Sequence, residues 1–176
     1  MNDLQELNDE RAITRVLLDY CRAVDRGDID LLKTVYHDDA MELRGVFEGP
    51  ASTFVGFVAA SVEAGQEMSH ATSNFRIDLD GDAADVESYV VATITLTHPD
   101  GDKVHEVLGA RFLDRFERRD GHWRIAVRRT IFDWSRTDPV TERTYWSRTP
   151  SPDYRMGSRS LQDPSYVSAA VGNGSV

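Results

Sequence analysis

Residues 104–134 read VHEVLGARFLDRFERRDGHWRIAVRRTIFDW, two alternating runs on either side of a short polar turn. Apolar and polar side chains alternate from Val104 to Glu117 and again from Trp123 to Trp134, the period of two that is typical of strands with one buried face. The Arg119-Asp120-Gly121 segment between them has the residue types of a tight turn. The stretch therefore predicts two long antiparallel strands joined as a hairpin.

The same period extends upstream and adds two more strands. Phe75 and Ile77 share one side of a strand that begins at about His70, and Asp80-Gly81-Asp82 then turns the chain into a strand from Ala84 to about Thr97. The segment HPDGD at residues 98–102 supplies the next turn. We therefore expect an antiparallel sheet of long strands.

Three helices are predicted before this sheet. Apolar residues recur at helical spacing from Ile13 to Val24, behind a capping segment at residues 8–10, and Gly27 ends this helix. Asp28 can cap a short second helix that runs through Val35. Pro50 opens a third helix from Ala51 to about Ala64. Helices followed by strands indicate an α+β fold.

Length and charge limit the function. A chain of 176 residues with 40% hydrophobic content suits one domain. The net charge of −10 argues against nucleic-acid and anionic-membrane partners, which need a basic face. No long apolar run or signal region is present, and a lone cysteine, Cys21, excludes an internal disulfide. These features predict a cytoplasmic protein.

The composition changes after Asp138-Pro139 to Ser, Arg, Pro and Tyr without periodicity. We therefore expect a domain at residues 1–138 and a C-terminal extension at residues 139–176. Tyr145, Trp146 and Tyr154 are too many aromatic residues for a solvated linker. They predict that part of the extension lies over the pocket or a neighbouring subunit.

His70 is the strongest of five histidine candidates for acid/base chemistry. It shares one strand face with Thr72 and Asn74, a polar stripe that would suit a substrate pocket or, equally, the wet face of an edge strand. Asp25, near the end of the first helix, could orient an imidazole. A helix-end aspartate satisfied by a nearby amide is the alternative.

Two further side chains could stabilise developing negative charge. The Tyr20 phenol could donate to an oxyanion, although a buried tyrosine with a satisfied hydroxyl is the commoner case. Arg128 alternates with Ala126 and Thr130 and would face the cavity beside Phe132, with a surface position as the alternative. Arg129 would take its place in the other strand register.

The remaining candidates are weaker. His105 is a possible second pocket histidine, whereas His37, His98 and His122 lie in turns or at a helix end. No metal-ligand spacing, phosphate-binding loop or nucleophile elbow is present, so we expect no metal and no cofactor. Five aromatic residues could line a pocket but fit ordinary core packing as well: Phe54, Phe57, Tyr89, Phe112 and Trp134.

Several stretches together resemble one superfamily. They are LDYCRAVDRGD at 18–28, DDA at 38–40, Ser69-His70, DGDA at 80–83 and FERRDGHWR at 116–124. Over Ile13 to Trp134 the chain resembles the SnoaL-like branch of the superfamily that includes nuclear transport factor 2, ketosteroid isomerase and scytalone dehydratase. The resemblance implies a cone-shaped, curved sheet with helices packed over it around one pocket.

Within that branch the chain is most similar to cofactor-independent lyases: hexachlorocyclohexane dehydrochlorinase, bile acid 7α-dehydratase and scytalone dehydratase. The resemblance implies that Asp25 and His70 form a catalytic dyad. It also implies that Tyr20 matches the tyrosine of the dehydratases, where the dehydrochlorinase has a lysine, and that Arg128 matches an arginine of the lyases. It further implies a homo-oligomer, with a trimer favoured.

The resulting prediction is a cofactor-independent lyase that acts on a hydrophobic cyclic or aromatic small molecule. The leaving group would be water or, with a lignin-type diaryl compound, formaldehyde. One alternative is a non-catalytic module of the same fold that binds a ligand or partner. The other is an enzyme like ketosteroid isomerase or a polyketide cyclase, which needs a carboxylate base on the sheet, where Asp114 and Asp133 are the candidates.

Overall fold

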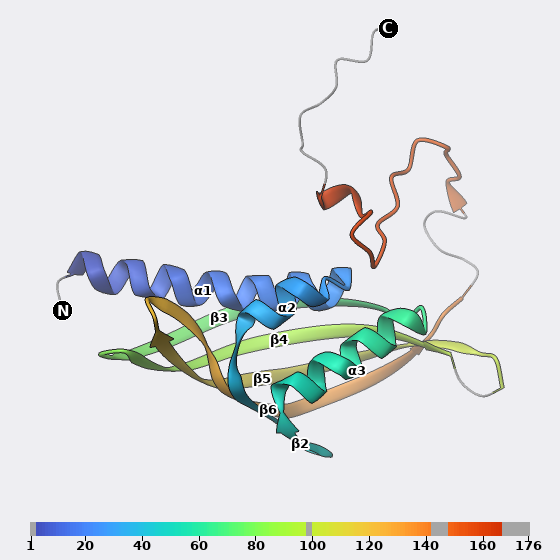
Figure 1. The fold of residues 1–176 in the computed structure, drawn as a ribbon. Helices are drawn as coiled ribbons and strands as arrows, with labels where there is room; N and C mark the ends of the chain where they lie inside the picture. The colour runs from blue at the N-terminus through green and yellow to red at the C-terminus, as the bar shows by residue number, and fades with distance from the viewer. Residues whose placement is uncertain (1–2, 98–99, 142–147, 167–176) are drawn as a thin grey trace, which may run out of the picture.

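The computed structural model describes residues 3–97, 100–141 and 148–166. Three helices lie on one side of a long, curved sheet (Figure 1). The elements in chain order are α1 (Asp3–Arg26), α2 (Ile29–Val35), β1 (Tyr36–Arg44), β2 (Phe47–Pro50), α3 (Ala51–Glu63), β3 (Glu67–Asp80), β4 (Ala83–Thr97), β5 (Lys103–Arg119), β6 (His122–Pro139) and the 3₁₀ helix η1 (Pro164–Tyr166). The predicted α+β class is confirmed.

The six strands are ordered β2-β1-β6-β5-β4-β3, so β2 and β3 are edges and the sheet does not close. β1 runs parallel to β6, and all other neighbours are antiparallel. The expectation of a purely antiparallel sheet is therefore wrong. β1 was not predicted from the sequence, because a register irregularity between Tyr36 and Met41 breaks its period of two.

The predicted start of the first helix is also wrong, since α1 already includes Asp3. Asp9 is not a cap but a buried residue inside the helix. Its carboxylate accepts hydrogen bonds of 2.8 Å from Trp123 Nε1 and from Arg118 Nη1. Asp9 therefore joins α1 to the hairpin of β5 and β6.

The junction between the first two helices is as predicted. Gly27 ends α1 with φ +65°, where a Cβ atom would also lie 2.9 Å from Val62. Asp28 caps α2, because its Oδ1 accepts from the Leu31 amide at 3.0 Å. The third helix begins at Ala51, directly after Pro50.

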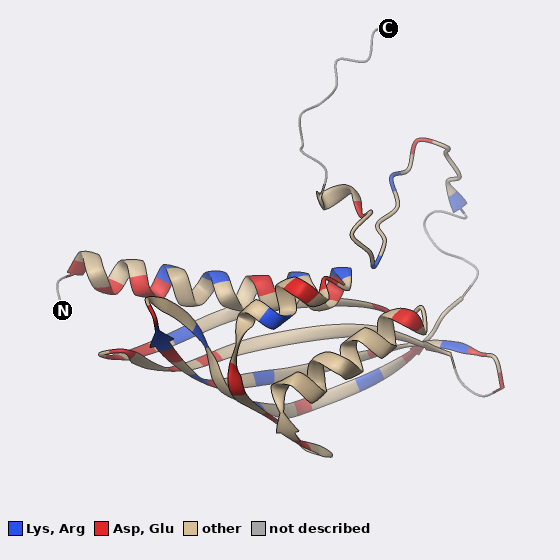
Figure 2. Cartoon of the chain, viewed as in Figure 1, with Lys and Arg blue, Asp and Glu red and all other residues tan. Residues whose placement is uncertain are grey.

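The core lies between the helices and the inner face of the sheet. Phe116 and Ile125 of the central strands and Ile13 and Leu17 of α1 are almost completely buried there. Charged residues are scattered over α1 and the strands, whereas α3 is almost uncharged (Figure 2). Arginines on β5 pair with neighbouring aspartates, as Arg111 does with Asp133 and Arg115 with Asp85. The described residues include no helix long and apolar enough to span a membrane.

In the C-terminal extension, residues 159–166 lie over the end of α1 and the start of α2 (Figure 1). Tyr166 Oη donates to Asp28 Oδ2 at 2.9 Å, and the Arg22 guanidinium stacks on the Tyr166 ring. The expectations for Tyr145 and Trp146, and for the turn at His98, fall on residues outside the described ranges.

Candidate active site

A cavity of about 190 Å³ lies between α1, α3 and the inner face of the sheet. Its walls are mostly apolar, with three polar side chains among them, Tyr20, Arg44 and His70, and a serine. The lining residues are Tyr20, Val24, Arg44, Phe54, Phe57, Val58, Ser61, Met68, His70 and Ile94. Such a combination of an apolar wall and few convergent polar groups is typical of a small-molecule site.

Asp25 and His70, 45 positions apart in sequence, meet at this cavity through two hydrogen bonds. Asp25 Oδ1 lies 2.6 Å from His70 Nδ1, and Asp25 Oδ2 accepts from the His70 backbone N–H at 2.8 Å. The side chains are 13% and 10% exposed. The contact fixes both the backbone and the ring of His70 relative to one carboxylate.

The fold explains why this contact forms. β3 is an edge strand, so part of its backbone amides have no partner strand and need another acceptor. The last turn of α1 packs along this strand and presents Asp25 to one such amide. The helix-end aspartate is thus satisfied by an amide, as the alternative interpretation held, and simultaneously binds the imidazole.

Tyr20 lies one and a half turns before Asp25 on α1 and is 1% exposed. Its ring lies 6.3 Å from the His70 ring in an edge-on arrangement, and its hydroxyl accepts from Arg44 Nη2 at 3.3 Å. Burial raises the pKa of Tyr20, an effect that Arg44 only partly opposes. Tyr20 is therefore a neutral donor at the cavity wall.

Arg128 points to the inner face, whereas Arg129 is exposed, which decides between the two registers. The Nε and Nη2 atoms of Arg128 donate to the two oxygens of Asp114 at 2.8 and 2.7 Å. The side chains of Arg128 and Asp114 are both 0% exposed. The Arg128 guanidinium lies 4.1 Å from the ring centroid of Tyr20 and 4.0 Å from that of Phe112. The expected neighbour Phe132 is instead 53% exposed. Arg128 therefore lies behind Tyr20 and does not line the cavity in the described part of the chain.

A second arginine at this site, Arg44 at the end of β1, was not among the residues predicted from the sequence. Its Nε donates to Glu42 Oε2 at 3.0 Å, and its guanidinium lies 4.0 Å from the Phe54 ring centroid. Burial alone lowers the pKa of Arg44, but Tyr20 and Glu42 beside it outweigh this and raise the pKa, so the group is cationic. Glu42 is fully buried and also accepts from the Tyr36 hydroxyl. Only recognition of β1 as a strand would have revealed this group.

The polar stripe predicted on β3 is interrupted. Thr72 donates to the Tyr89 carbonyl, and Asn74 adopts φ +53° at a register irregularity. His105 hydrogen-bonds to Thr95 on β4, whereas the adjacent Ile94 lines the cavity. Because neighbouring strand residues face opposite sides, His105 lies on the outer face and is not a pocket histidine.

The five aromatic candidates divide among three places. Phe54 and Phe57 line the cavity, and Phe112 lies in the core beneath Tyr20. Tyr89 and Trp134 border a hollow on the outer face of the sheet. The aromatic pocket is therefore limited to residues of α3 and Tyr20.

The two sheet carboxylates considered as bases are both engaged elsewhere. Asp114 is completely buried against Arg128. Asp133 accepts two hydrogen bonds from Arg111, at 3.0 and 3.1 Å, on the outer face. Within the described residues, no group of three or more His, Cys, Asp or Glu side chains could hold a metal ion.

An α+β cone with helices over one face of a curved sheet, and polar groups converging in a cavity beneath them, defines the class of nuclear transport factor 2-like proteins. The sequence model of the SnoaL-like domain matches residues 5–129. The chain belongs to the SnoaL-like family. A comparison with curated proteins finds no significant match.

Solved structures share the fold at low sequence identity. A hexachlorocyclohexane dehydrochlorinase, LinA type 3 from Novosphingobium barchaimii, is 21% identical over 80% of this chain and 96% of its own, with a TM-score of 0.66. A protein proposed to be a scytalone dehydratase, from Novosphingobium aromaticivorans, is 21% identical over 79% and 97%, with a TM-score of 0.65. A Mycobacterium tuberculosis protein of unknown function is 23% identical over 76% and 77%, with a TM-score of 0.62. These similarities show the fold alone.

Proposed function

We propose that this chain is a cofactor-independent lyase that eliminates a small leaving group from a hydrophobic cyclic or aromatic molecule. The observation that carries the proposal is the two-point contact between Asp25 and His70 at the wall of an apolar cavity. A histidine held by a carboxylate in a sheltered site is the arrangement that general acid/base catalysis requires. The dehydratase and dehydrochlorinase names among the structural neighbours agree with this chemistry.

Asp25 determines which nitrogen of His70 acts as the base. Because Nδ1 donates its proton to the carboxylate, Nε2 is the basic nitrogen. Nε2 removes a proton from carbon, and the C–H electron pair forms the new double bond while a hydroxyl leaves from the adjacent carbon. The hydroxyl takes a proton from the imidazolium and departs as water. His70 thus returns to its neutral form, and Asp25 stabilises the transient imidazolium.

The roles of Tyr20 and Arg128 in this proposal differ from each other. Tyr20 lines the cavity and would touch the substrate, as a donor to a developing oxyanion or to the leaving group. Arg128 stacks on Tyr20 from behind and is occupied by Asp114. We therefore propose that Arg128 acts through Tyr20 as a positioning residue.

The size of the cavity favours a substrate with one ring in the site. A cavity of about 150 Å³ binds benzene in an engineered protein, and the cavity here measures about 190 Å³. A cyclic hydroxyketone therefore fits better than both rings of a diaryl diol, whose second ring would have to lie at the cavity mouth. Loss of water is accordingly our first expectation, and loss of formaldehyde the second.

The quaternary structure and the extension belong to the same proposal. Tyr89, Val91 and Trp134 are between 43% and 51% exposed around one hollow of the outer face, which favours a homo-oligomer, with a trimer first. The C-terminal extension would support the dyad through Arg159, which donates to the Val24 carbonyl in α1 and to the carbonyl of Gln66, the residue before β3. A cytoplasmic location stays a prediction.

The test is a metal-free substrate screen by mass spectrometry with wild type, His70→Ala and Asp25→Asn. The compounds are cyclic hydroxyketones and lignin-type diaryl diols. We expect wild type to release water or formaldehyde. Each variant should lose about 10²- to 10⁴-fold in kcat, the usual contribution of positioned acid/base groups. The matched control is His122→Ala, because His122 is exposed at the start of β6.

Two results would argue against the proposed lyase in which Asp25 and His70 act. Conversion that persists in His70→Ala would remove the dyad from the mechanism. A folded wild type that converts nothing but retains a compound, and retains it equally in both variants, would favour the non-catalytic ligand-binding module.

A further inference from the structure

Arg44 is the one cationic side chain among the ten described residues that line the cavity. Its side chain is 23% exposed, whereas that of Arg128 is 0% exposed. A ligand in the cavity can therefore reach Arg44 without displacing a core residue.

Hydrogen bonds from two of the three guanidinium nitrogens of Arg44 hold the group in a fixed plane. Nε and Nη2 both lie 3.0 Å from Glu42 Oε2, and Nη2 also donates to Tyr20 Oη at 3.3 Å. The Phe54 ring supports the plane from one side at 4.0 Å. Within the described part of the chain, Nη1 makes no hydrogen bond. Two donors of cavity-lining residues are therefore left for a ligand, Nη1 of Arg44 and the hydroxyl proton of Tyr20, whose oxygen accepts from Arg44.

The charges around this pair of donors select the kind of oxygen that binds. Glu42 is completely buried and already neutralises Arg44, and Asp25 adds a further negative charge at the other end of the cavity wall. A carboxylate ligand would bring one more negative charge into this low-dielectric site, which is costly. An uncharged carbonyl oxygen avoids that cost and gains from both donors as negative charge develops on it during reaction.

We infer that Arg44 and Tyr20 form the binding site for the carbonyl oxygen of a neutral, single-ring ketone, and that Arg44 is a catalytic residue. This inference rests on the proposed elimination in the same cavity and names its substrate class. His70 removes the proton from the carbon next to the carbonyl. The C–H electron pair forms the carbon–carbon double bond of an enolate, and the carbonyl π pair moves to the oxygen bound by Arg44 and Tyr20. Collapse of the enolate re-forms the carbonyl and makes the carbon–carbon double bond to the following carbon, whose hydroxyl takes the proton from the His70 imidazolium and leaves as water.

The test uses para-nitrophenol, whose oxygen and ring mimic the enolate and whose ionised form is seen directly by absorbance. Its methyl ether, para-nitroanisole, has the same ring but a blocked oxygen. The variant is Arg44→Gln combined with Glu42→Gln, because removal of Arg44 alone would leave Glu42 buried without a partner. We expect this variant to bind para-nitrophenol about 10-fold or more weakly, the loss that corresponds to about 1.4 kcal/mol. Affinity for para-nitroanisole should change less than twofold, and wild type should bind para-nitrophenol more tightly than benzoate.

The inference is overturned if the variant binds para-nitrophenol as wild type does, if both probes lose affinity equally, or if benzoate binds more tightly than para-nitrophenol. Its failure is distinct from failure of the lyase proposal. His70→Ala should retain the para-nitrophenol affinity, because the oxygen site does not include His70. Elimination by wild type that is undiminished in the Arg44 and Glu42 variant would leave the lyase standing without this oxygen site.

Discussion

At the scale of single residues, the two arginines beside Tyr20 differ in burial and in role. Arg128 makes a bidentate ion pair with Asp114 and reaches no solvent, whereas Arg44 shares one carboxylate oxygen with its partner and faces the cavity. A buried ion pair is expensive to form, and breaking it from one side is more expensive still. The two arginines should therefore respond differently to substitution.

For Arg128 we predict a loss of stability that a second substitution restores. Arg128→Leu should lower the free energy of unfolding by about 3–5 kcal/mol, because it leaves Asp114 buried without its cation. Arg128→Leu combined with Asp114→Leu should recover most of this loss. Urea unfolding followed by tryptophan fluorescence measures both. If the single variant is as stable as wild type, the ion pair does not have the structural role assigned to it.

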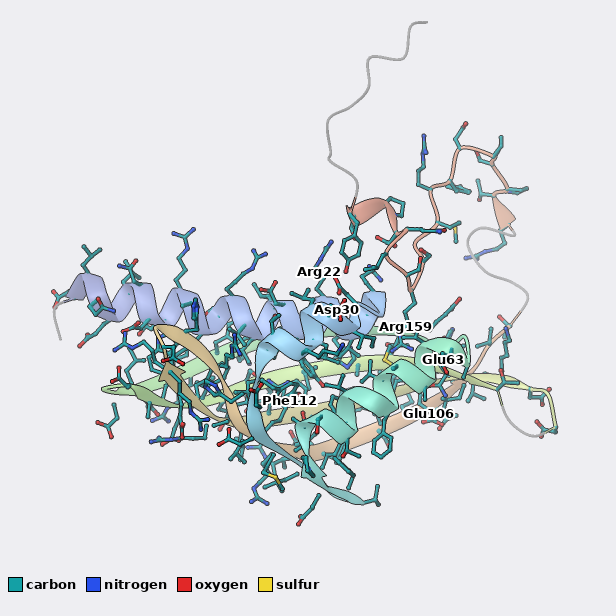
Figure 3. The ribbon with its side chains drawn as sticks, in the orientation of Figure 1. Arg22, Asp30, Glu63, Glu106, Phe112 and Arg159 are labelled. Carbon is teal, nitrogen blue, oxygen red and sulfur yellow. The ribbon has the colours of Figure 1, made fainter. Side chains whose placement is uncertain are left out.

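At the scale of elements, the end of α1 and the start of β3 are joined by the extension as well as by the dyad. Arg159 donates from Nε to the Val24 carbonyl at 3.0 Å and from Nη1 to the Gln66 carbonyl at 3.0 Å. Figure 3 shows Arg159 reaching from the extension toward the helices. Val24 precedes Asp25, and Gln66 directly precedes β3, which carries His70. Arg159 thus spans the two elements whose separation sets the dyad geometry.

We predict that Arg159→Ala lowers kcat about 10- to 100-fold with a smaller change in KM, because small displacements of positioned groups are costly for catalysis. Arg159→Lys should restore part of the rate, since an ammonium can still bond one of the two carbonyls. Arg155→Ala is the matched control, as Arg155 is exposed in the same segment. Equal kcat values for the Arg159 and Arg155 variants would exclude a positioning role.

Near the other end of α1, Asp9 joins the helix to the hairpin of β5 and β6. The stability that Asp9 contributes should vary with pH. Burial raises the pKa of Asp9, but hydrogen bonds from Trp123, Gln5 and Arg118 outweigh it and lower the pKa below its ordinary value. A lowered folded-state pKa means that Asp9 stabilises the fold above its unfolded pKa of about 3.9. The contribution is lost as the pH falls through the lower, folded-state pKa.

Asp9→Asn should therefore be less stable than wild type at neutral pH, and the difference should shrink as the pH is lowered below about 4. Urea unfolding of both proteins across this range measures the difference. The matched control is Asp30→Asn, which removes a carboxylate that is exposed on α2 and pairs with the exposed Lys33. A difference that is constant with pH would mean that the Asp9 charge is not what joins α1 to the sheet.

For the whole molecule, the outer face of the sheet is the feature that the helices leave uncovered. Trp134 packs directly on Gly109, where a Cβ atom would lie 2.1 Å from the indole, so the flat glycine surface holds this ring in place. With Tyr89 and Val91 it forms an apolar patch on a chain that is otherwise highly charged. Such a patch is typical of a subunit interface.

We predict that the protein is a trimer and that Val91→Glu combined with Trp134→Glu dissociates it, because two carboxylates would be buried without partners in an apolar interface. Sedimentation equilibrium measures the mass of each form. Leu18→Glu, an exposed apolar position on α1, should leave the mass unchanged. A monomeric wild type, or a double variant of unchanged mass, would contradict this use of the outer face.

The sequence by itself determined the three helices, the long strands β3 to β6, and the caps at Gly27 and Asp28. These features follow from local periodicity and turn chemistry, which act between residues close in the chain. The resemblance to SnoaL-like proteins selected Asp25 and His70 from residues that were each ambiguous alone. Their catalytic role stays a proposal.

Only the tertiary structure decided that the sheet is mixed, that His105 faces outward, and that Arg44 lines the cavity while Arg128 does not. β1 has an irregular pattern and pairs in parallel with β6, more than 80 residues away in sequence, so no local signal marks it. Arg44 reaches the cavity because of that pairing, and Arg128 is withdrawn by the buried carboxylate opposite it on β5. Contacts between distant segments, and the charges that they bury together, decide which side chains a ligand can reach.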